Sequence, residues 1–232
     1  MENYQSKGQV CEEFYNAIFD IIGQKGTLIV PTYTYILSSN QSFDPKNSAS
    51  KMGVFAEWVR THTDSIRSLD PAYSVAAIGT DADYYCDNIP NNSFSKDSVF
   101  DRILTNDAKI LCFNHPGCTF LHFIERELKV PYRFDKTFYC RQVINSKIIE
   151  QEWTIWVRYL SDDKLIHSPS KFVNSIKSES IANFAKLGRG EILSISASKV
   201  FSSVKTSLKK DPWFLINADS NDISVRIDKR YK

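Results

Sequence analysis

Apolar residues recur at two different spacings in the first part of the chain. Residues 8–23 place apolar side chains every three or four positions, which predicts an amphipathic helix that ends at Gly23. The apolar run after Gly26 predicts a central strand that leads to Pro31. A helix followed by such a strand favours parallel β/α packing. The expected buried face of the helix consists of Val10, Phe14, Ala17, Ile18, Ile21 and Ile22.

The same alternation continues in the middle of the chain. Residues 38–52 are polar and rich in turn formers, which predicts a surface loop, and residues 67–74 predict an exposed turn. Ser98 stands before an apolar-periodic stretch and Asp101 follows three positions later, which is the spacing of a capping box. The other expected elements are helices at 53–61, 81–86 and 98–104 and a short buried strand at 75–78.

A short central segment changes from strand spacing to helix spacing. Ala108–Phe113 predicts a buried strand, and the sequence Asn-His-Pro-Gly at 114–117 predicts a turn. A helix is expected from Thr119, whose hydroxyl is expected to cap the first turn. A helix start carries unpaired backbone N–H groups and partial positive charge. His122 lies in that turn and Glu125 follows on the same face, so the junction predicts a base beside hydrogen-bond donors.

In the C-terminal half, the apolar residues show no helical spacing over residues 132–160 and show it again from residue 169. Residues 132–160 predict two or three antiparallel strands. Residues 169–187 predict a helix, residues 191–197 a strand, and residues 198–210 a final helix. Together these elements predict an α/β fold with a mixed sheet. No internal repeat or linker divides the sequence, so we expect a single domain over residues 1–232.

The composition restricts the class of protein. The 232 residues carry a formal net charge of +2, which gives no electrostatic reason to expect nucleic-acid binding. No apolar run approaches about 18 residues and the N-terminus lacks a signal-peptide pattern, so no membrane association is expected. Five cysteines, an odd and scattered number, do not form a disulfide framework. The cytoplasm is the expected location.

Seven segments of the chain form an ordered set. They are KGTLIVPTYTY (25–35), RSLDPAYSVAAIG (67–79), DSVFDRIL (97–104), GCTFLHFIE (117–125), VPYRFDKTF (130–138), LGRGEILSISA (187–197) and KKDPWFL (209–215). In this order they resemble the antibiotic N-acetyltransferase family, whose namesakes acetylate the 3-amino group of aminoglycosides. The resemblance implies a mixed central sheet flanked by helices, with an antiparallel strand insertion.

The resemblance also implies an acyl-CoA co-substrate, either acetyl-CoA or another acyl-CoA. It points to the turn formed by Pro31, Thr32, Tyr33 and Thr34 and to the helix start at Ser98 as parts of the CoA site. Strand-end turns and helix starts suit amides and phosphates, and these positions carry hydroxyls. A plain N-cap role is the alternative for Ser98.

Family members usually begin with a further strand before the first helix. The present sequence starts close to that helix. We therefore expect either that Met1 is not the start of the full-length protein or that the domain lacks this strand and part of the acyl-donor site.

Acyl transfer to an amine requires that the ammonium lose a proton before its nitrogen attacks. A base with a pKa near 7 suits this step, and histidine meets that requirement. The resemblance assigns the role to His122, while Glu125 either orients the imidazole or holds the cationic amine. No metal ion is expected.

The expected acceptor is an amino sugar. Residues 125–142 hold five lysines and arginines against three acidic residues and include tyrosines. Such a basic surface favours a nucleotide-linked deoxyamino sugar of polysaccharide biosynthesis, although a solvated face would explain the charges equally well. The alternatives are an aminoglycoside 3-N-acetyltransferase that confers antibiotic resistance and a catalytically inactive amino-sugar-binding protein. The sequence leaves a homo-oligomer open.

Several residues support other interpretations. Cys112, His115, Cys118 and His122 are the residue types of a zinc knuckle, but their spacing falls across a strand, a turn and a helix, which disfavours a metal site. A second alternative makes Cys118 a nucleophile whose pKa is lowered at the helix start.

Two further pairs of charged residues stand in predicted loops. Arg67 and Asp70 are expected to organise the turn before Ser74. Asp162 and Asp163 lie in a polar loop, where they either meet a cationic sugar or remain solvated.

Overall fold

The structure is a computed structural model that describes residues 6–114, 118–160 and 165–218. The chain divides into two compact units, each built from two separate parts of the sequence. The first unit contains residues 1–93 and 137–154, and the second contains residues 94–136 and 155–232. The prediction of one acyltransferase domain over the whole chain stays a prediction.

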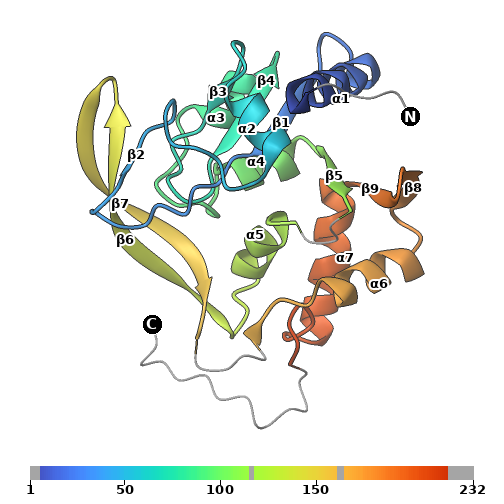
Figure 1. The fold of residues 1–232 in the computed structure, drawn as a ribbon. Helices are drawn as coiled ribbons and strands as arrows, with labels where there is room; N and C mark the ends of the chain where they lie inside the picture. The colour runs from blue at the N-terminus through green and yellow to red at the C-terminus, as the bar shows by residue number, and fades with distance from the viewer. Residues whose placement is uncertain (1–5, 115–117, 161–164, 219–232) are drawn as a thin grey trace. The chain divides into compact units, whose positions relative to one another are not determined.

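The first unit is built on a three-stranded sheet with the order β1-β4-β3 (Figure 1). Its strands are β1 (Thr27–Pro31), β4 (Val75–Gly79) and β3 (Ile66–Arg67). Both pairs are antiparallel, with Thr27 opposite Gly79 and Ile66 opposite Ala77. The expectation of parallel packing is therefore wrong for β1, because a helix that precedes a strand does not fix the direction of the strand beside it. The helices of this unit are α1 (Lys7–Ile22), α2 (Val54–Arg60) and α3 (Ala82–Cys86).

The core of the first unit lies between this sheet and two of its helices. Buried residues of β1, α2 and β4 form one cluster: Val30, Ala56, Val59, Ala76 and Ile78. Tyr15 and Phe19 of α1 pack against this cluster, and Cys11 is the buried residue of that helix. Val10 and Ile21 are exposed, Ile21 by 85%, so the predicted buried face of α1 is wrong in part. The aromatic residues beside the apolar stripe make the tertiary contacts.

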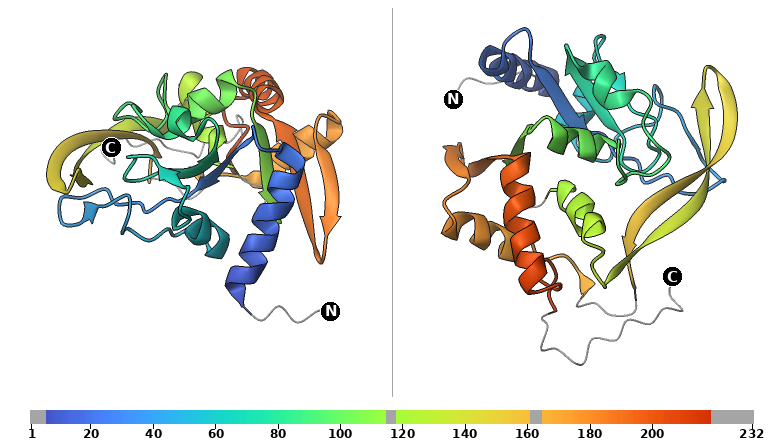
Figure 2. Two further views of the ribbon diagram at one scale, coloured as in Figure 1. Left: turned by 90° about the horizontal axis from the view of Figure 1, so that it is seen from above. Right: turned by 180° about the vertical axis from the view of Figure 1, so that it is seen from behind.

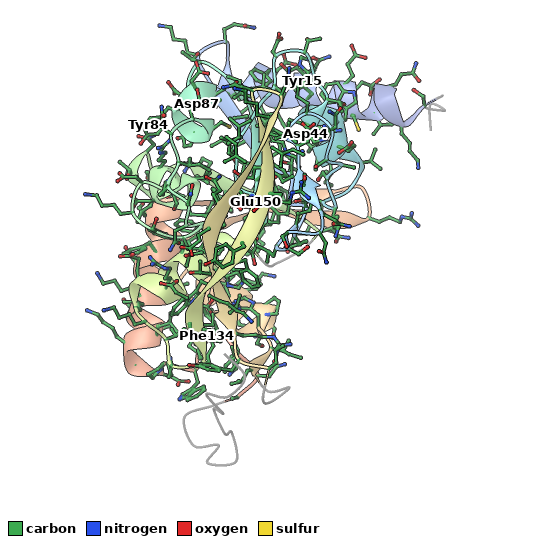
Figure 3. All side chains as sticks on the ribbon, turned by 90° about the vertical axis from the view of Figure 1, so that its left-hand side faces the viewer. Tyr15, Asp44, Tyr84, Asp87, Phe134 and Glu150 are labelled. Carbon is green, nitrogen blue, oxygen red and sulfur yellow. The ribbon has the colours of Figure 1, made fainter. Side chains whose placement is uncertain are left out.

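Residues 132–160 form the predicted antiparallel strands as one long hairpin. The hairpin consists of β6 (Arg133–Ile144) and β7 (Lys147–Arg158), and the short strand β2 (Ser42–Phe43) pairs with β6 in parallel. Asn145 and Ser146 form the turn with positive φ angles of 50° and 63°, the backbone of a type I′ turn. Figure 3 shows Glu150 on β7, where its carboxylate lies 3.6 Å from the Arg141 guanidinium of β6.

The second unit contains an antiparallel sheet with the order β5-β9-β8. Its strands are β5 (Lys109–Phe113), β9 (Gly190–Ser196) and β8 (Asn183–Leu187), and its helices are α4 (Val99–Thr105), α5 (Phe120–Glu127), α6 (Pro169–Ser178) and α7 (Ala197–Lys210). Helix α7 lies beside α6 and also contacts α4 and α5 (Figure 2). Together with the first unit, these elements confirm the predicted mixed α/β fold.

Two predictions for the second unit are wrong. The helix expected over 169–187 ends at Ser178, and residues 183–187 form β8, because Phe184 pairs with Leu193 of β9 across the Gly188 turn. The strand expected to be buried at 108–113 is only half-buried, with Leu111 and Phe113 exposed on one face. Among the described residues, no helix is both long enough and apolar enough to span a membrane.

Candidate active site

Helix α5 begins differently from the sequence prediction. Thr119 takes the right-handed helical conformation and its side chain makes no capping bond. Instead, the backbone N–H groups of Phe120 and Leu121 interact with the Cys118 thiol, and the N–H of His122 donates to the Thr119 carbonyl over 2.9 Å. The donors expected to be free at this helix start are thus engaged within the helix. Residues 115–117 of the predicted turn lie outside the described residues.

The Glu125 carboxylate is the centre of a buried polar cluster in the second unit. It is fully buried, and the His122 Nδ1 atom lies 2.7 Å from its Oε2 atom. The Tyr132 hydroxyl donates to its Oε1 atom over 2.7 Å, and the Arg133 Nε atom lies 2.9 Å from Oε2. Helix α5 supplies His122 and Glu125 from successive turns, and the residues that lead into β6 supply the other two. The predicted pairing of His122 with Glu125 is present.

The charges in this cluster determine the tautomer of His122. Burial alone would raise the pKa of Glu125, but the Arg133 guanidinium and His122 lower it to about 2. The ionised carboxylate only accepts hydrogen bonds, so the His122 Nδ1 atom carries the proton and its Nε2 atom keeps the lone pair. Burial and then the nearby Arg133 charge lower the pKa of His122, which favours a neutral imidazole at pH 7. The His122 side chain is 20% exposed, so it remains accessible to a ligand.

A second histidine lies beside this pair. The ring of His167 stands at 85° to the ring of His122, with 5.7 Å between their centres. Its Nε2 atom is buried and has no hydrogen-bond partner among the described residues. Burial is the main reason that the pKa of His167 is lowered to about 4, with the Glu125 charge opposing the shift and His122 and Arg133 adding to it. The second unit therefore brings together two neutral imidazoles around one carboxylate.

The sequence left two alternative roles for the cysteines, a nucleophile at Cys118 and a zinc knuckle. Burial raises the pKa of the Cys118 thiol, which argues against the alternative of an activated nucleophile at the helix start. The described residues contain no group of three or more metal-ligating side chains. His115, one of the four residues of the hypothetical zinc knuckle, lies outside them.

The predicted CoA-binding turn belongs to the first unit. Pro31 is exposed at the end of β1, whereas Thr32, Tyr33 and Thr34 are buried. The Thr32 hydroxyl donates to the Ser74 carbonyl over 3.1 Å, and the Thr34 hydroxyl donates to the carbonyl of Pro71. These hydroxyls hold the turn against residues 71–74. Their role in binding CoA stays a prediction.

The expected structural roles of Arg67 and Asp70 are confirmed, although their turn is buried rather than exposed. The Arg67 guanidinium donates to the carbonyl of Thr32 over 2.6 Å and to the carbonyl of Ser48 over 2.6 Å. The Asp70 carboxylate accepts the backbone N–H groups of Ala72 and Tyr73, each over 2.8 Å.

Ser98 belongs to the second unit and is the N-cap of α4. Its hydroxyl accepts the backbone N–H of Asp101 over 3.4 Å and is buried. This geometry explains the residue as a cap, and a contact with CoA stays a prediction. Asp162 and Asp163 lie outside the described residues.

The basic surface expected over residues 125–142 is neutralised in part. Arg126 makes two bonds of 2.8 Å to Asp135, and Arg133 is buried against Glu125. Tyr132 is fully buried, so it offers no stacking surface to a nucleobase. These residues therefore give no support to the binding of a nucleotide-linked sugar.

Comparison with known proteins shows the family of the chain. The sequence profile described as aminoglycoside 3-N-acetyltransferase matches residues 4–209. The chain belongs to this family. Its members are CoA-dependent N-acetyltransferases, which confirms the predicted enzyme class and the acetyl-CoA co-substrate. No curated protein sequence matches the chain significantly.

Three solved structures illustrate the similarity in fold. AAC-VIa bound to sisomicin has a TM-score of 0.75 and 18% identity, over 87% of this chain and 85% of that one. The binary complex of AAC-IIIb with CoASH has a TM-score of 0.73 and 19% identity, over 86% and 83%. The aminoglycoside acetyltransferase AAC(3)-IVa has a TM-score of 0.72 and 21% identity, over 92% and 79%. At these identities the similarity concerns the fold.

Sequence reasoning missed three residues of the cluster. Tyr132 and Arg133 belong to the segment interpreted as a surface, although an aromatic and a basic residue so soon after Glu125 are natural partners for a buried carboxylate. His167 stands more than forty positions from His122, in a segment without a periodic pattern. No local signal in the sequence could have connected it to the site.

Proposed function

We propose that the protein transfers the acetyl group of acetyl-CoA to an amine of an aminoglycoside, with His122 as the general base and Glu125 as the residue that orients it. The observation that carries this proposal is the 2.7 Å contact between the His122 Nδ1 atom and the ionised Glu125 carboxylate. It leaves the Nε2 lone pair of a neutral, partly exposed imidazole available for a proton. Membership of the acetyltransferase family supports the same reaction class.

The reaction balances with the residues of the cluster. The acceptor ammonium first gives up a proton to solvent, and the nitrogen of the neutral amine then forms a bond to the thioester carbonyl carbon while His122 removes a second proton. The C–S bond breaks, its electron pair leaves with the CoA sulfur, and the imidazolium returns its proton to that thiolate. Glu125 stabilises the transient positive charge on His122 without taking the proton.

The acceptor class follows from the charges and the comparisons. Of the basic residues that favoured a nucleotide-linked sugar, Arg126 and Arg141 lie beside carboxylates and Arg133 is buried against Glu125. Neighbouring structures of the same fold are described as bound to sisomicin and to a gentamicin. We therefore propose an aminoglycoside ahead of a nucleotide-linked amino sugar.

Two further assignments concern the acyl donor and the compartment. Residues 31–34 of the first unit are proposed to contribute to CoA binding, and so, separately, is Ser98 of the second unit. The five free cysteines fit a reducing compartment, and we propose the cytoplasm. A homo-oligomer stays an open prediction.

The test is a comparison of acceptors with the purified full chain. Thiol release from acetyl-CoA is followed with sisomicin, gentamicin and kanamycin and with dTDP-, UDP- and GDP-linked amino sugars, and mass spectrometry identifies the acetylated product. We expect kcat/KM for the drugs to exceed that for the nucleotide sugars by tenfold or more, about 1.4 kcal/mol in transition-state binding. A tenfold preference for the nucleotide sugars would reverse the acceptor assignment. Calorimetric binding of acceptors without any turnover would instead support a binding protein.

A further inference from the structure

The position of His167 is fixed by its backbone. His167 forms an antiparallel bridge with Ile216, the Ser168 N–H donates to the Leu215 carbonyl over 2.7 Å, and the Asn217 N–H donates to the Ile166 carbonyl over 3.0 Å. These contacts fix the backbone on both sides of the ring. The ring itself lies edge-to-face against the ring of His122.

The Nε2 atom of this histidine is not used by the fold. It is buried and has no partner in the part of the chain that the structure describes. A buried polar atom without a hydrogen bond costs about 1–3 kcal/mol, so a side chain kept in this state requires an explanation. The charged groups around it are Glu125 and Arg133, which pair with each other, and His122, which bonds Glu125. None of them supplies a donor to Nε2.

We propose that His167 binds the acceptor substrate, with its Nε2 atom accepting a hydrogen bond from the reacting amine. The inference rests on the proposed function, since it assumes that an amine reaches the Nε2 atom of His122. An ammonium carries three N–H groups, and one base can remove only one proton at a time. A second imidazole beside the first can hold another N–H and thereby orient the nitrogen lone pair. A neutral ring suits this role because it accepts a hydrogen bond without repelling the cation.

Two substitutions separate this role from a structural one. His167→Phe keeps an aromatic ring but removes the acceptor atom, and His167→Gln keeps an acceptor oxygen. We expect H167F to raise the KM and the calorimetric Kd for sisomicin about tenfold or more, H167Q to raise them by about threefold, and both to leave the KM for acetyl-CoA within about twofold. His62→Phe is the matched control, since His62 belongs to the first unit and packs on Tyr15. Unchanged acceptor affinity in H167F would overturn the proposal, and so would a fall in kcat alone, which is the signature of a donor to the thioester oxygen.

A measurement on the wild-type protein keeps the inference testable if the variants do not fold. The imidazole ¹⁵N resonances report whether each ring nitrogen carries a proton or accepts a hydrogen bond. We expect the Nε2 resonance of His167 to be that of an unprotonated nitrogen and to shift when sisomicin is added. No shift at a saturating amine concentration would overturn the inference. Because this readout needs no turnover, it distinguishes a failure of the His167 assignment from a failure of the proposed reaction.

Discussion

The Nδ1 atom of His122 and the Oε2 atom of Glu125 lie 2.7 Å apart, and the carboxylate is fully buried. The Tyr132 hydroxyl donates to its other oxygen, and the Arg133 guanidinium forms an ion pair with the carboxylate over 2.9 Å. This relationship between His122 and Glu125 supports the proposed role of the histidine as a base. The carboxylate fixes the tautomer, and the fixed tautomer determines which nitrogen faces a substrate.

Replacement of His122 is expected to remove the base without removing the fold. His122→Gln should lower kcat for acetyl transfer by about 10²–10⁴, because proton removal from the acceptor is no longer assisted. Steady-state kinetics by thiol release measures the loss, and circular dichroism checks the fold. Activity within about threefold of wild type would remove His122 from the role of general base.

Replacement of Glu125 should affect both catalysis and stability. Glu125→Gln leaves the Arg133 guanidinium buried without its counter-charge, and breaking a buried ion pair costs about 3–5 kcal/mol. It also frees the His122 ring from its fixed tautomer. We expect a lower kcat and a lower midpoint in urea. The matched control is Glu127→Gln at an exposed position of the same helix, which should change neither value. Equal behaviour of the two variants would contradict the assignment.

Substitution of Cys118 should leave turnover largely intact. Its thiol has a raised pKa and interacts with backbone N–H groups at the start of α5, so Cys118→Ser keeps an acceptor there. We expect kcat/KM within a few-fold of wild type and no covalent acyl-enzyme, as measured by intact-protein mass spectrometry with acetyl-CoA alone. A mass increment on Cys118 would support nucleophilic catalysis instead.

The free energy of unfolding should decrease as the pH is lowered, first because His167 takes up a proton and then because Glu125 does. The pKa of this histidine is lowered from 6.5 to about 4 in the folded protein, so the unfolded chain binds a proton first as the pH falls. Its contribution is fully present above about pH 6.5 and is lost progressively towards pH 4, by up to about 3 kcal/mol. Urea unfolding between about pH 4 and 7 should show a shallower fall for H167F than for wild type. Parallel curves would contradict the lowered pKa.

Protonation of Glu125 should lower the free energy of unfolding further at still lower pH. The pKa of Glu125 is lowered from 4.5 to about 2, so its stabilising contribution is present above about pH 4.5 and is lost as the pH falls to 2. The two windows meet between about pH 4 and 4.5, so the wild-type curve should keep falling below the pH at which the histidine effect ends. E125Q should lack this lower part of the fall, and its upper part should extend to lower pH because the Glu125 charge no longer raises the pKa of His167. A curve that stays flat below pH 4 in the wild type would contradict the lowered pKa of Glu125.

The C-terminal end of β4 packs so closely against Gly26 and Thr27 that Gly79 should tolerate no side chain. A Cβ atom there would lie 2.1 Å from the Gly26 carbonyl oxygen, and the φ angle of +127° disfavours any other residue. We expect Gly79→Ala to lower the free energy of unfolding by at least about 2 kcal/mol. Gly188→Ala is the control, since it has a positive φ but nothing within 4 Å, and it should cost about 1 kcal/mol. Chemical unfolding of both variants decides the point.

The sequence predicted most elements of the fold because hydrophobic period reflects local backbone geometry. The helix α1, the hairpin β6–β7, the strand β5 and the helix α5 all follow from such periods. Two features do not follow from the hydrophobic period: the antiparallel direction of β1 beside β4, and the strand formed by residues 183–187. Both depend on pairing with distant residues. The exposed Ile21 shows that an apolar stripe does not by itself determine which side chains become buried.

The candidate site was predictable only where its residues are neighbours in the chain. His122 and Glu125 stand three positions apart on one helix, so their contact follows from helical geometry. Arg133 and Tyr132 were assigned to a surface because composition gives charge but not burial. His167 reaches the cluster through its backbone bridge to Ile216, a long-range contact that no spacing rule contains.

The division of each compact unit into two sequence segments has a consequence for biosynthesis. The first unit is interrupted after residue 93 and resumes at residue 137, and its last residues arrive at 154. Among these is Trp153, whose indole N–H donates to the Ser93 hydroxyl over 3.0 Å. At about 5–20 residues per second, a ribosome needs roughly 3–12 s to translate from residue 93 to residue 154. The nascent N-terminal sheet must wait that long for its partner segment, so a fragment that stops at residue 93 would emerge as an incomplete core and a natural client for chaperones.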